Sequence, residues 1–431
     1  MSGPTLTRRS FLAAGTGTMA LAAAGGVPAM AQANKRMRMY WWGSKERADR
    51  TIKANGLYMA RNPSVTIEGE TLGWGDYWPR MATQAAGRNL PDEIQMDYRY
   101  IFEYARRGAL LPLDEFVPKT LAITDFGKEA TDSGRVDGKL YGINLGMNSS
   151  TVLFMRDAFA QAGVKAPTHQ MSWKEFAAAA AELTKAAKKD GFFGTQDGGG
   201  VEPAFEGWLR SRGKELYSGD DKLGFAAEDA GEWFAMWDEM RKSKACVPPD
   251  VQALDKLSPD SSMIVLGKAA VCFAHSNQLV AYQVLTKEKL GMSMYPNVGP
   301  GSKLGHYLKP SMLWSVAATS RNAEEAARIV NFFVADAEGG RAIGVERGVP
   351  ASAAMRATIG PDLDELGKMM VDYISFVSDK VGALPPPPPK GAGEIAFLLK
   401  RVNEEVGFGK TKVADSGKAF VTEAQSILAR G

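Results

Sequence analysis

The chain has 431 residues, more than one hydrophobic core usually supports, and we expect two domains. Hydrophobic residues make up 45% and charged residues 23%, with a formal charge of +3, which is typical of a soluble globular protein. No strong basic run follows residue 50 and no 18-residue apolar segment follows residue 31. These absences argue against nucleic-acid binding and against a membrane-spanning mature protein.

The first 31 residues have the features of an export signal. Arg8 and Arg9 precede a weakly apolar segment rich in alanine and glycine, which ends in the small-residue sequence Ala-Met-Ala at 29–31. Paired arginines at this place resemble a twin-arginine (Tat) signal, and a transit segment is the alternative. Cleavage would remove both arginines and lower the formal charge from +3 to about +1. No cysteine follows for lipid attachment, so we expect a free periplasmic protein.

Cys246 and Cys272 are the only cysteines of the chain, and their spacing matches no metal site. An oxidising compartment permits a disulfide between them, and two buried thiols are equally compatible with the sequence. The chain has three histidines, His169, His275 and His306, so we expect no structural zinc site and no cofactor.

Strands and helices are expected to alternate over the first 108 residues. The hydrophobic pattern and the breaker residues predict strands at 36–42, 65–72 and 93–97, and helices at 48–63, 75–88 and 100–108. This alternation favours a mostly parallel sheet covered by helices. Within the first strand Trp41 and Trp42 must point to opposite faces, and we expect Trp41 in the core.

The pattern changes at 138–159, where two extended apolar runs around Gly146 indicate a crossover between two lobes. A helix at 172–189 carries Ser172 and Glu175 as a capping box. The other predicted elements are a strand at 192–200, a helix at 230–243 with Trp233 and Trp237 in the core, a strand at 269–274, a strand pair within 306–320, a helix at 322–335, a turn at 346–352, a surface polyproline II segment at 385–389 and two final helices.

Residues 36–431 contain a series of short motifs, each of which occurs once. They are WWGSKERADR, AAGRNLPDEIQMD, YARRGALLPLDEF, DGKLYGINLGMNSSTVLFMRDAFAQAG with SWKEF, LGKAAVCFA, SRNAEEAARIVNFF and GVPAS. Together they resemble the extracytoplasmic carbohydrate-binding proteins of ABC importers, the family 1 group that includes maltose-binding protein. None of these motifs is catalytic.

The resemblance implies a two-lobed α/β fold with mainly parallel sheets flanked by helices, and hinge strands that join the lobes. It implies a monomer that closes around a carbohydrate and delivers it to the permease subunits of an ABC importer, without catalysis. The expected parts are the signal at 1–31, an N-terminal lobe of 32–147 plus about 305–350, a C-terminal lobe of 148–304 plus about 351–431, and hinges near 145–151, 300–308 and 349–352.

Candidate ligand contacts follow the predicted strands, because ligands of parallel α/β sheets lie at the carboxyl ends of strands. Aromatic rings stack on sugar faces, and carboxylates, amides and arginines bind hydroxyls in pairs. The candidates are Trp42, Gly43, Ser44, Trp74, Asp97, Tyr98, Asn148, Trp208, Asn277, Trp314 and Arg347.

Several of these candidates also have a purely structural interpretation. Core packing is the alternative for the tryptophans, helix capping for Asp97, and pairing with Glu346 or a surface carboxylate for Arg347. An acidic sugar and a neutral one both remain compatible with the arginines of the chain. Other functional hypotheses are a binding protein for a polyamine or phosphodiester, and a glycan-active enzyme that uses Asp76 and Asp97.

Overall fold

The computed structural model describes residues 34–299 and 301–430. The predicted export signal lies outside these residues. The described residues form two large hydrophobic cores, one from residues 37–145 with 312–351, the other mainly from residues 152–295 with 355–427, beside two small clusters. Each core therefore draws on two distant parts of the chain, as the predicted two-lobed α/β fold requires. None of the described helices is both long enough and apolar enough to cross a bilayer.

The first lobe contains a five-stranded sheet in the order β2-β1-β3-β12-β6. Its strands are β1 (Lys35–Trp42), β2 (Val65–Leu72), β3 (Glu93–Met96), β6 (Ile143–Asn144) and β12 (Leu313–Val316). β1 is parallel to both β2 and β3, whereas β12 is antiparallel to β3 and β6. The carboxyl ends of β1, β2 and β3 therefore meet at one edge.

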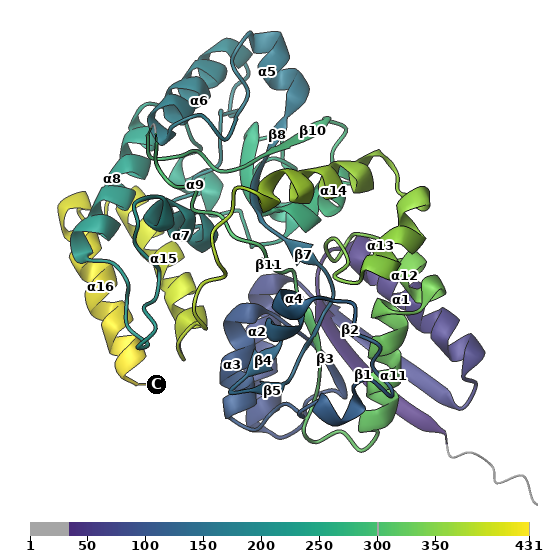
Figure 1. The fold of residues 1–431 in the computed structure, drawn as a ribbon. Helices are drawn as coiled ribbons and strands as arrows, with labels where there is room; N and C mark the ends of the chain where they lie inside the picture. Colours follow the sequence, from purple (N-terminus) through teal and green to yellow (C-terminus); the bar gives the residue numbers. More distant parts are fainter. Residues whose placement is uncertain (1–33, 300, 431) are drawn as a thin grey trace, which may run out of the picture.

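Helices of the first lobe begin directly after the three parallel strands. Ser44 caps the first helix by accepting from the Arg47 backbone N–H at 3.2 Å, and Asp97 caps the third by accepting from that of Arg99 at 2.9 Å. These short connections place three helix N-termini at the same sheet edge (Figure 1). The helices are α1 (Lys45–Arg61), α2 (Trp74–Ala86), α3 (Tyr98–Arg106), α4 (Lys128–Asp132), α11 (Ala323–Val334) and α12 (Ala337–Ile343). The small strands β4 (Arg135–Val136) and β5 (Lys139–Leu140) complete the lobe.

The second lobe contains a three-stranded sheet of β10 (Leu290–Ser293), β8 (Ser150–Met155) and β9 (Val271–His275). Both pairings are antiparallel, so the parallel order expected for the sheets holds only among β1, β2 and β3. The strand predicted at 192–200 is wrong. Phe193 and Thr195 make isolated parallel bridges, and Gly198 then lies so close to Trp237 that a Cβ atom would clash at 2.7 Å.

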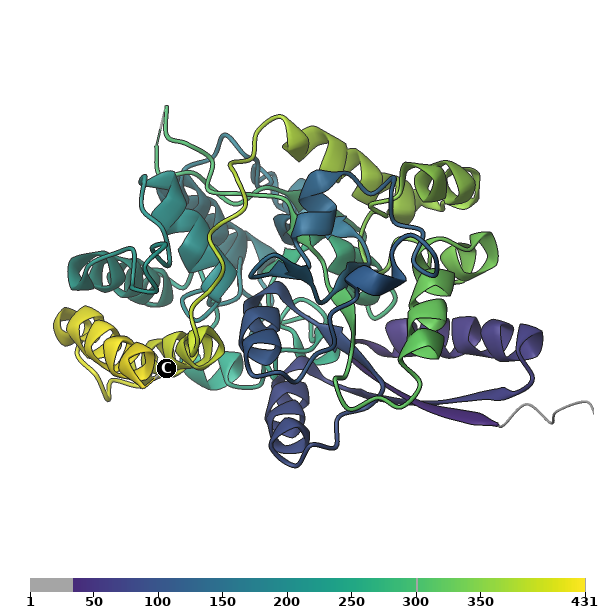
Figure 2. The same cartoon turned by 60° about the horizontal axis from the view of Figure 1, so that its bottom comes forward.

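Helices enclose the core around this second sheet. They include α8 (Ala227–Lys242) and the last two helices of the chain, α15 (Ala392–Gly407) and α16 (Val413–Ala429), which pack against α8. In both views α15 and α16 lie in yellow beside the teal α8 (Figure 1, Figure 2). The helices are α5 (Arg156–Ala162), α6 (Trp173–Ala187), α7 (Glu202–Ser211), α8 (Ala227–Lys242), α9 (Pro249–Gln252), α10 (Leu279–Gln283), α13 (Ala353–Ile359), α14 (Glu365–Ser378), α15 (Ala392–Gly407) and α16 (Val413–Ala429). The predicted capping box of Ser172 and Glu175 and the core positions of Trp233 and Trp237 are confirmed.

The two cysteines are unpaired and buried, which decides between the two interpretations of the sequence. Burial raises the pKa of both thiols, of Cys246 and of Cys272, well above the usual value. Such thiols stay protonated near neutral pH and react slowly.

Three chain segments meet between the lobes. β7 (Met147–Asn148) pairs antiparallel with β11 (Lys309–Pro310), and Met147 also exchanges backbone hydrogen bonds with Val349 at 2.7 and 3.0 Å. Figure 1 shows β7 and β11 at this junction. Gly146 permits the close approach, because a Cβ atom there would lie 2.7 Å from the Arg347 carbonyl oxygen. The backbone of the crossing is therefore tightly packed.

Glu93→Gln is expected to stabilise the protein above about pH 5. Glu93 is buried in β3 without a hydrogen-bond partner for either carboxylate oxygen, and its burial, with repulsion from Asp92 and Glu325, raises its pKa well above the usual value. The folded chain therefore keeps a proton that the unfolded chain loses above about pH 4.3. The free energy of unfolding of the natural protein falls as the pH rises from that value toward the raised pKa of the folded state, and the variant escapes this loss.

Thermal denaturation at about pH 5 and about pH 8 tests this expectation. The Tm advantage of the variant should grow by roughly 1 °C between the two pH values for each kcal/mol of change, given the unfolding entropy of a chain of this length. Glu324→Gln is the control, because the Glu324 carboxylate is exposed on α11. An advantage that stays constant or shrinks with rising pH contradicts a buried, protonated Glu93.

Candidate ligand pocket between the lobes

A cavity of about 240 Å³ lies between the lobes, at the sheet edge where β1, β2 and β3 end. Residues of the first lobe, of the crossing segments and of the second lobe all line it. Its volume is just below the range of roughly 300–1,000 Å³ that ligand pockets usually have. Seven of the eleven predicted contacts line this cavity, namely Trp42, Gly43, Ser44, Trp74, Asp97, Asn148 and Asn277.

The aromatic part of the first-lobe wall consists of Trp42 and Trp74. Their rings meet edge to face with centroids 5.1 Å apart, and Trp42 also packs against Tyr77 and Trp78. Trp41 is fully buried on the opposite face of β1, which confirms its predicted place in the core. Trp42 is only 7% exposed, so it serves both as a wall of the pocket and as part of an aromatic cluster.

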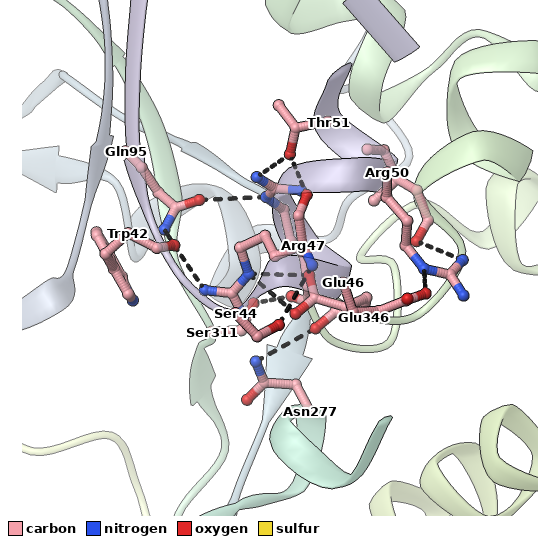
Figure 3. Close-up of polar contacts among 12 residues, drawn as sticks. Trp42, Ser44, Glu46, Arg47, Arg50, Thr51, Gln95, Asn277, Ser311 and Glu346 are labelled. Carbon is pink, nitrogen blue, oxygen red and sulfur yellow. Dashed lines mark hydrogen bonds and ion pairs between the residues drawn. The ribbon is translucent and has the colours of Figure 1, made fainter. Parts of the chain in front are cut away.

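The backbone carbonyl of Trp42 is held from two sides (Figure 3). It accepts hydrogen bonds from Arg47 Nη1 at 3.1 Å and from Gln95 Nε2 at 3.0 Å. Arg47 Nε in turn donates to both carboxylate oxygens of Glu346, at 3.0 and 2.9 Å, in a buried ion pair. This network ties the end of β1 to a crossing segment, so the wall is preorganised before any ligand enters.

Arg347 and Trp314 lie in the interior of the first lobe and do not line the pocket. Arg347 donates to Thr51 Oγ1 at 2.8 Å and to Gln95 Oε1 at 3.2 Å, and its guanidinium lies 5.5 Å from the ring centroid of Trp314. Arg347 therefore does not line the pocket, and among the described residues its side chain donates hydrogen bonds to Thr51 and Gln95 and not to Glu346. Glu346 and Arg347 are neighbours in this turn, but Glu346 lines the pocket whereas Arg347 lies in the interior of the first lobe.

Two other candidates also lie outside the pocket. Trp208 is packed in the core of the second lobe, near Phe205 and beneath the guanidinium of Arg212 at 4.2 Å, as its core interpretation expected. Tyr98 faces a smaller neighbouring cavity of about 40 Å³, where its hydroxyl donates to the Pro385 carbonyl oxygen at 3.4 Å. The predicted polyproline segment forms one side of that smaller cavity.

Asp97 has two structural partners in addition to its place in the pocket wall. Its carboxylate caps α3, and Lys309 Nζ lies 3.6 Å from Oδ2. Asn148 Nδ2 donates to Asn277 Oδ1 at 2.7 Å, across the junction of a crossing segment and the second lobe. The Oδ1 atom of Asn148 is buried and has no partner among the described residues, so it is available to a ligand donor.

The sequence analysis missed most of the second-lobe wall. Glu202 and Pro203 open α7 there, and His275 follows the buried part of β9. Aromatic rings of Phe273 and Tyr295 complete this side. Glu202 follows the glycine-rich stretch at 198–200, which is the one feature of the sequence that indicated its position. For the other residues of the second-lobe wall, the only indication in the sequence is their place near the end of a strand.

An ion pair connects the two walls. Arg99, in the first turn of α3, pairs with Glu202, the first residue of α7, and both side chains are mostly buried. Among the residues that the structure describes, no group of three His, Cys, Asp or Glu side chains has the arrangement of a metal site. The pocket therefore combines aromatic surfaces, amides and paired charges, which is a set that suits polar, hydroxylated ligands.

A putative binding protein of Brucella abortus (strain 2308) is 24% identical to this chain over 285 residues. The match covers 64% of this chain and 66% of the relative, just under two thirds of its length. A periplasmic oligogalacturonide-binding protein from Yersinia enterocolitica, in complex with saturated digalacturonic acid, is similar in structure with a TM-score of 0.81 at 21% identity. An ABC substrate-binding protein from Listeria monocytogenes, in complex with cycloalternan, has a TM-score of 0.78 at 20% identity.

Both structural matches cover 92% of this chain and 99% of the compared chain, which confirms the two-lobed fold predicted from the sequence. Residues 54–358 match the family model described as bacterial extracellular solute-binding protein. This match spans more than half of the chain and agrees with the position of the pocket between two lobes. The chain therefore belongs to the family of bacterial extracellular solute-binding proteins.

Proposed function

We propose that this protein captures a sugar, glycoside or oligosaccharide between its lobes and delivers it to the permease subunits of an ABC importer. The observation that carries the proposal is the pocket itself, which is lined by the indole rings of Trp42 and Trp74 together with the amides of Asn148 and Asn277 and the hydroxyl of Ser311. A sugar offers apolar faces to such rings and hydroxyls to such polar groups. Sugars bound by the Yersinia and Listeria proteins support this class of ligand.

Capture would depend on movement of the lobes. We assign residues 32–147 with about 305–350 to one moving body and 148–304 with about 351–431 to the other. The hinges would lie near 145–151, 300–308 and 349–352, close to the backbone pairing of Met147 with Val349. Binding then favours the closed arrangement because a ligand touches both walls only there.

The proposal includes no catalytic step. A glycosidase needs two carboxyl groups that flank a scissile bond. Of the two carboxylates considered from the sequence, Asp76 does not line the pocket, and Asp97 caps α3 and lies near Lys309. The proposal also includes export by the Tat route, a periplasmic location and a monomeric state, with no nucleic-acid partner.

A thermal-shift panel tests the class of ligand. It contains neutral and acidic mono- and oligosaccharides, with spermidine and a glycerophosphodiester for the alternative solutes. We expect at least one glycan to raise Tm and to saturate a change in tryptophan fluorescence, because Trp42 and Trp74 line the pocket. A response to spermidine or the phosphodiester alone contradicts the proposal, and so does turnover of chromogenic glycosides.

Trp74→Ala should lower the affinity for the glycan selected by that panel at least tenfold, about 1.4 kcal/mol. Trp74 is only partly buried, so the substitution removes a pocket surface at moderate cost in stability. Trp314→Phe is the matched control, because Trp314 is buried in the same lobe but away from the pocket. Isothermal titration calorimetry measures both variants. Equal affinities for Trp74→Ala and the natural protein would show that the ligand binds elsewhere.

A further inference from the structure

The charges around the pocket cancel. Four cationic and four anionic side chains line it, so their formal sum is zero; they are Arg47, Arg99, Lys309 and Lys400, and Asp97, Glu202, Asp255 and Glu346. A pocket built for an anionic sugar would be expected to present an excess of cations, because buried anions need a positive partner.

Each of the four cations also has a carboxylate partner. The pairs are Arg47–Glu346, Arg99–Glu202, Lys309–Asp97 and Lys400–Glu404. The first is almost fully buried, with Arg47 Nε donating to both carboxylate oxygens, and the third is the loosest, with a separation of 3.6 Å. Among the described residues of the pocket wall, every guanidinium and ammonium group therefore has a carboxylate oxygen within 3.6 Å.

The Arg99–Glu202 pair is the one that joins the two walls. Arg99 comes from α3 of the first lobe and Glu202 from α7 of the second, and their side chains are 16% and 11% exposed. Separation of the lobes would break this pair and leave Arg99 as a free cation. The neutral state of the pocket therefore depends on the closed arrangement of the lobes.

The unsatisfied polar atoms of the wall are uncharged. Asn148 Oδ1 and His275 Nδ1 are buried without a partner among the described residues. Burial, with Lys309 and Arg99 nearby, holds the pKa of His275 well below its usual value, so the ring is neutral at pH 7. An amide oxygen and a neutral imidazole form hydrogen bonds with hydroxyl groups and supply no charge.

We propose that the closed pocket selects uncharged glycans, and that Glu202 determines this specificity by neutralising Arg99. The inference rests on the proposed function and narrows its ligand class. A uronate in the closed pocket would face Asp97, Glu202 and Glu346 and would have to displace one of them from its cation. An anion buried without a free cation is strongly disfavoured, whereas a hydroxyl in its place is not.

Matched sugars that differ only at C6, where a carboxylate replaces a hydroxymethyl group, test the proposal. Calorimetry at pH 7 compares α-1,4-galactobiose with digalacturonic acid, and cellobiose with cellobiouronic acid, on the chain from residue 32. We expect the uncharged member of the bound pair to bind at least about tenfold more tightly. Digalacturonic acid bound at least about tenfold more tightly than galactobiose would overturn the proposal. If no sugar of the thermal-shift panel binds, the proposed function fails and this inference fails with it.

Glu202→Gln tests the role of Glu202 directly, because it leaves the positive charge of Arg99 without its carboxylate partner. The affinity for digalacturonic acid should rise at least about fivefold and decrease with added salt, while the affinity for the uncharged sugar falls with loss of the lobe-joining pair. If the role of Glu202 were purely structural, the substitution would lower the affinities for both sugars alike. Arg99→Gln should show no gain for the acid, and Glu394→Gln, an exposed carboxylate outside the pocket, should change neither affinity. Absence of any gain in Glu202→Gln would overturn the assignment.

Discussion

The backbone pairing of Met147 with Val349 and of β7 with β11 holds the two lobes together. Three segments far apart in the sequence meet there, and each leads from one hydrophobic core into the other. The same segments supply Asn148, Lys309 and Glu346 to the pocket wall. A change in the angle between the lobes must therefore pass through these segments, directly beside a bound ligand.

The polar network around the pocket explains how a cleft between moving bodies keeps a defined shape. The carbonyl of Trp42 is held by Arg47 and Gln95, and Arg47 is held by Glu346. A buried ion pair of this kind contributes little net stability, but loss of one partner leaves an unpaired buried charge and costs about 3–5 kcal/mol. The network thus fixes the backbone of Trp42 at the end of β1 more than it stabilises the fold. The glycan would meet a wall that is already in place.

Much of the first lobe could be predicted from sequence, because a helix begins within three residues of the end of each parallel strand, and a side chain caps the helices after β1 and β3. That local rule also located Trp42, Ser44, Trp74 and Asp97 at the pocket. It failed where tertiary packing decides the direction of one side chain. Neighbours in a turn can point to the cleft or to the core, as Glu346 and Arg347 do, and no local pattern separates them. Glu202 was missed because its partner is Arg99 in the other lobe.

Small-angle X-ray scattering, with and without the glycan that gives the largest thermal shift, tests the central claim most directly. The claim is that a sugar is enclosed between two lobes joined at Met147 and Val349. Saturation with that glycan should lower the radius of gyration of the chain from residue 32, because the ligand favours the closed arrangement. A radius of gyration that stays the same, under conditions where calorimetry shows full occupancy, would contradict capture by closure.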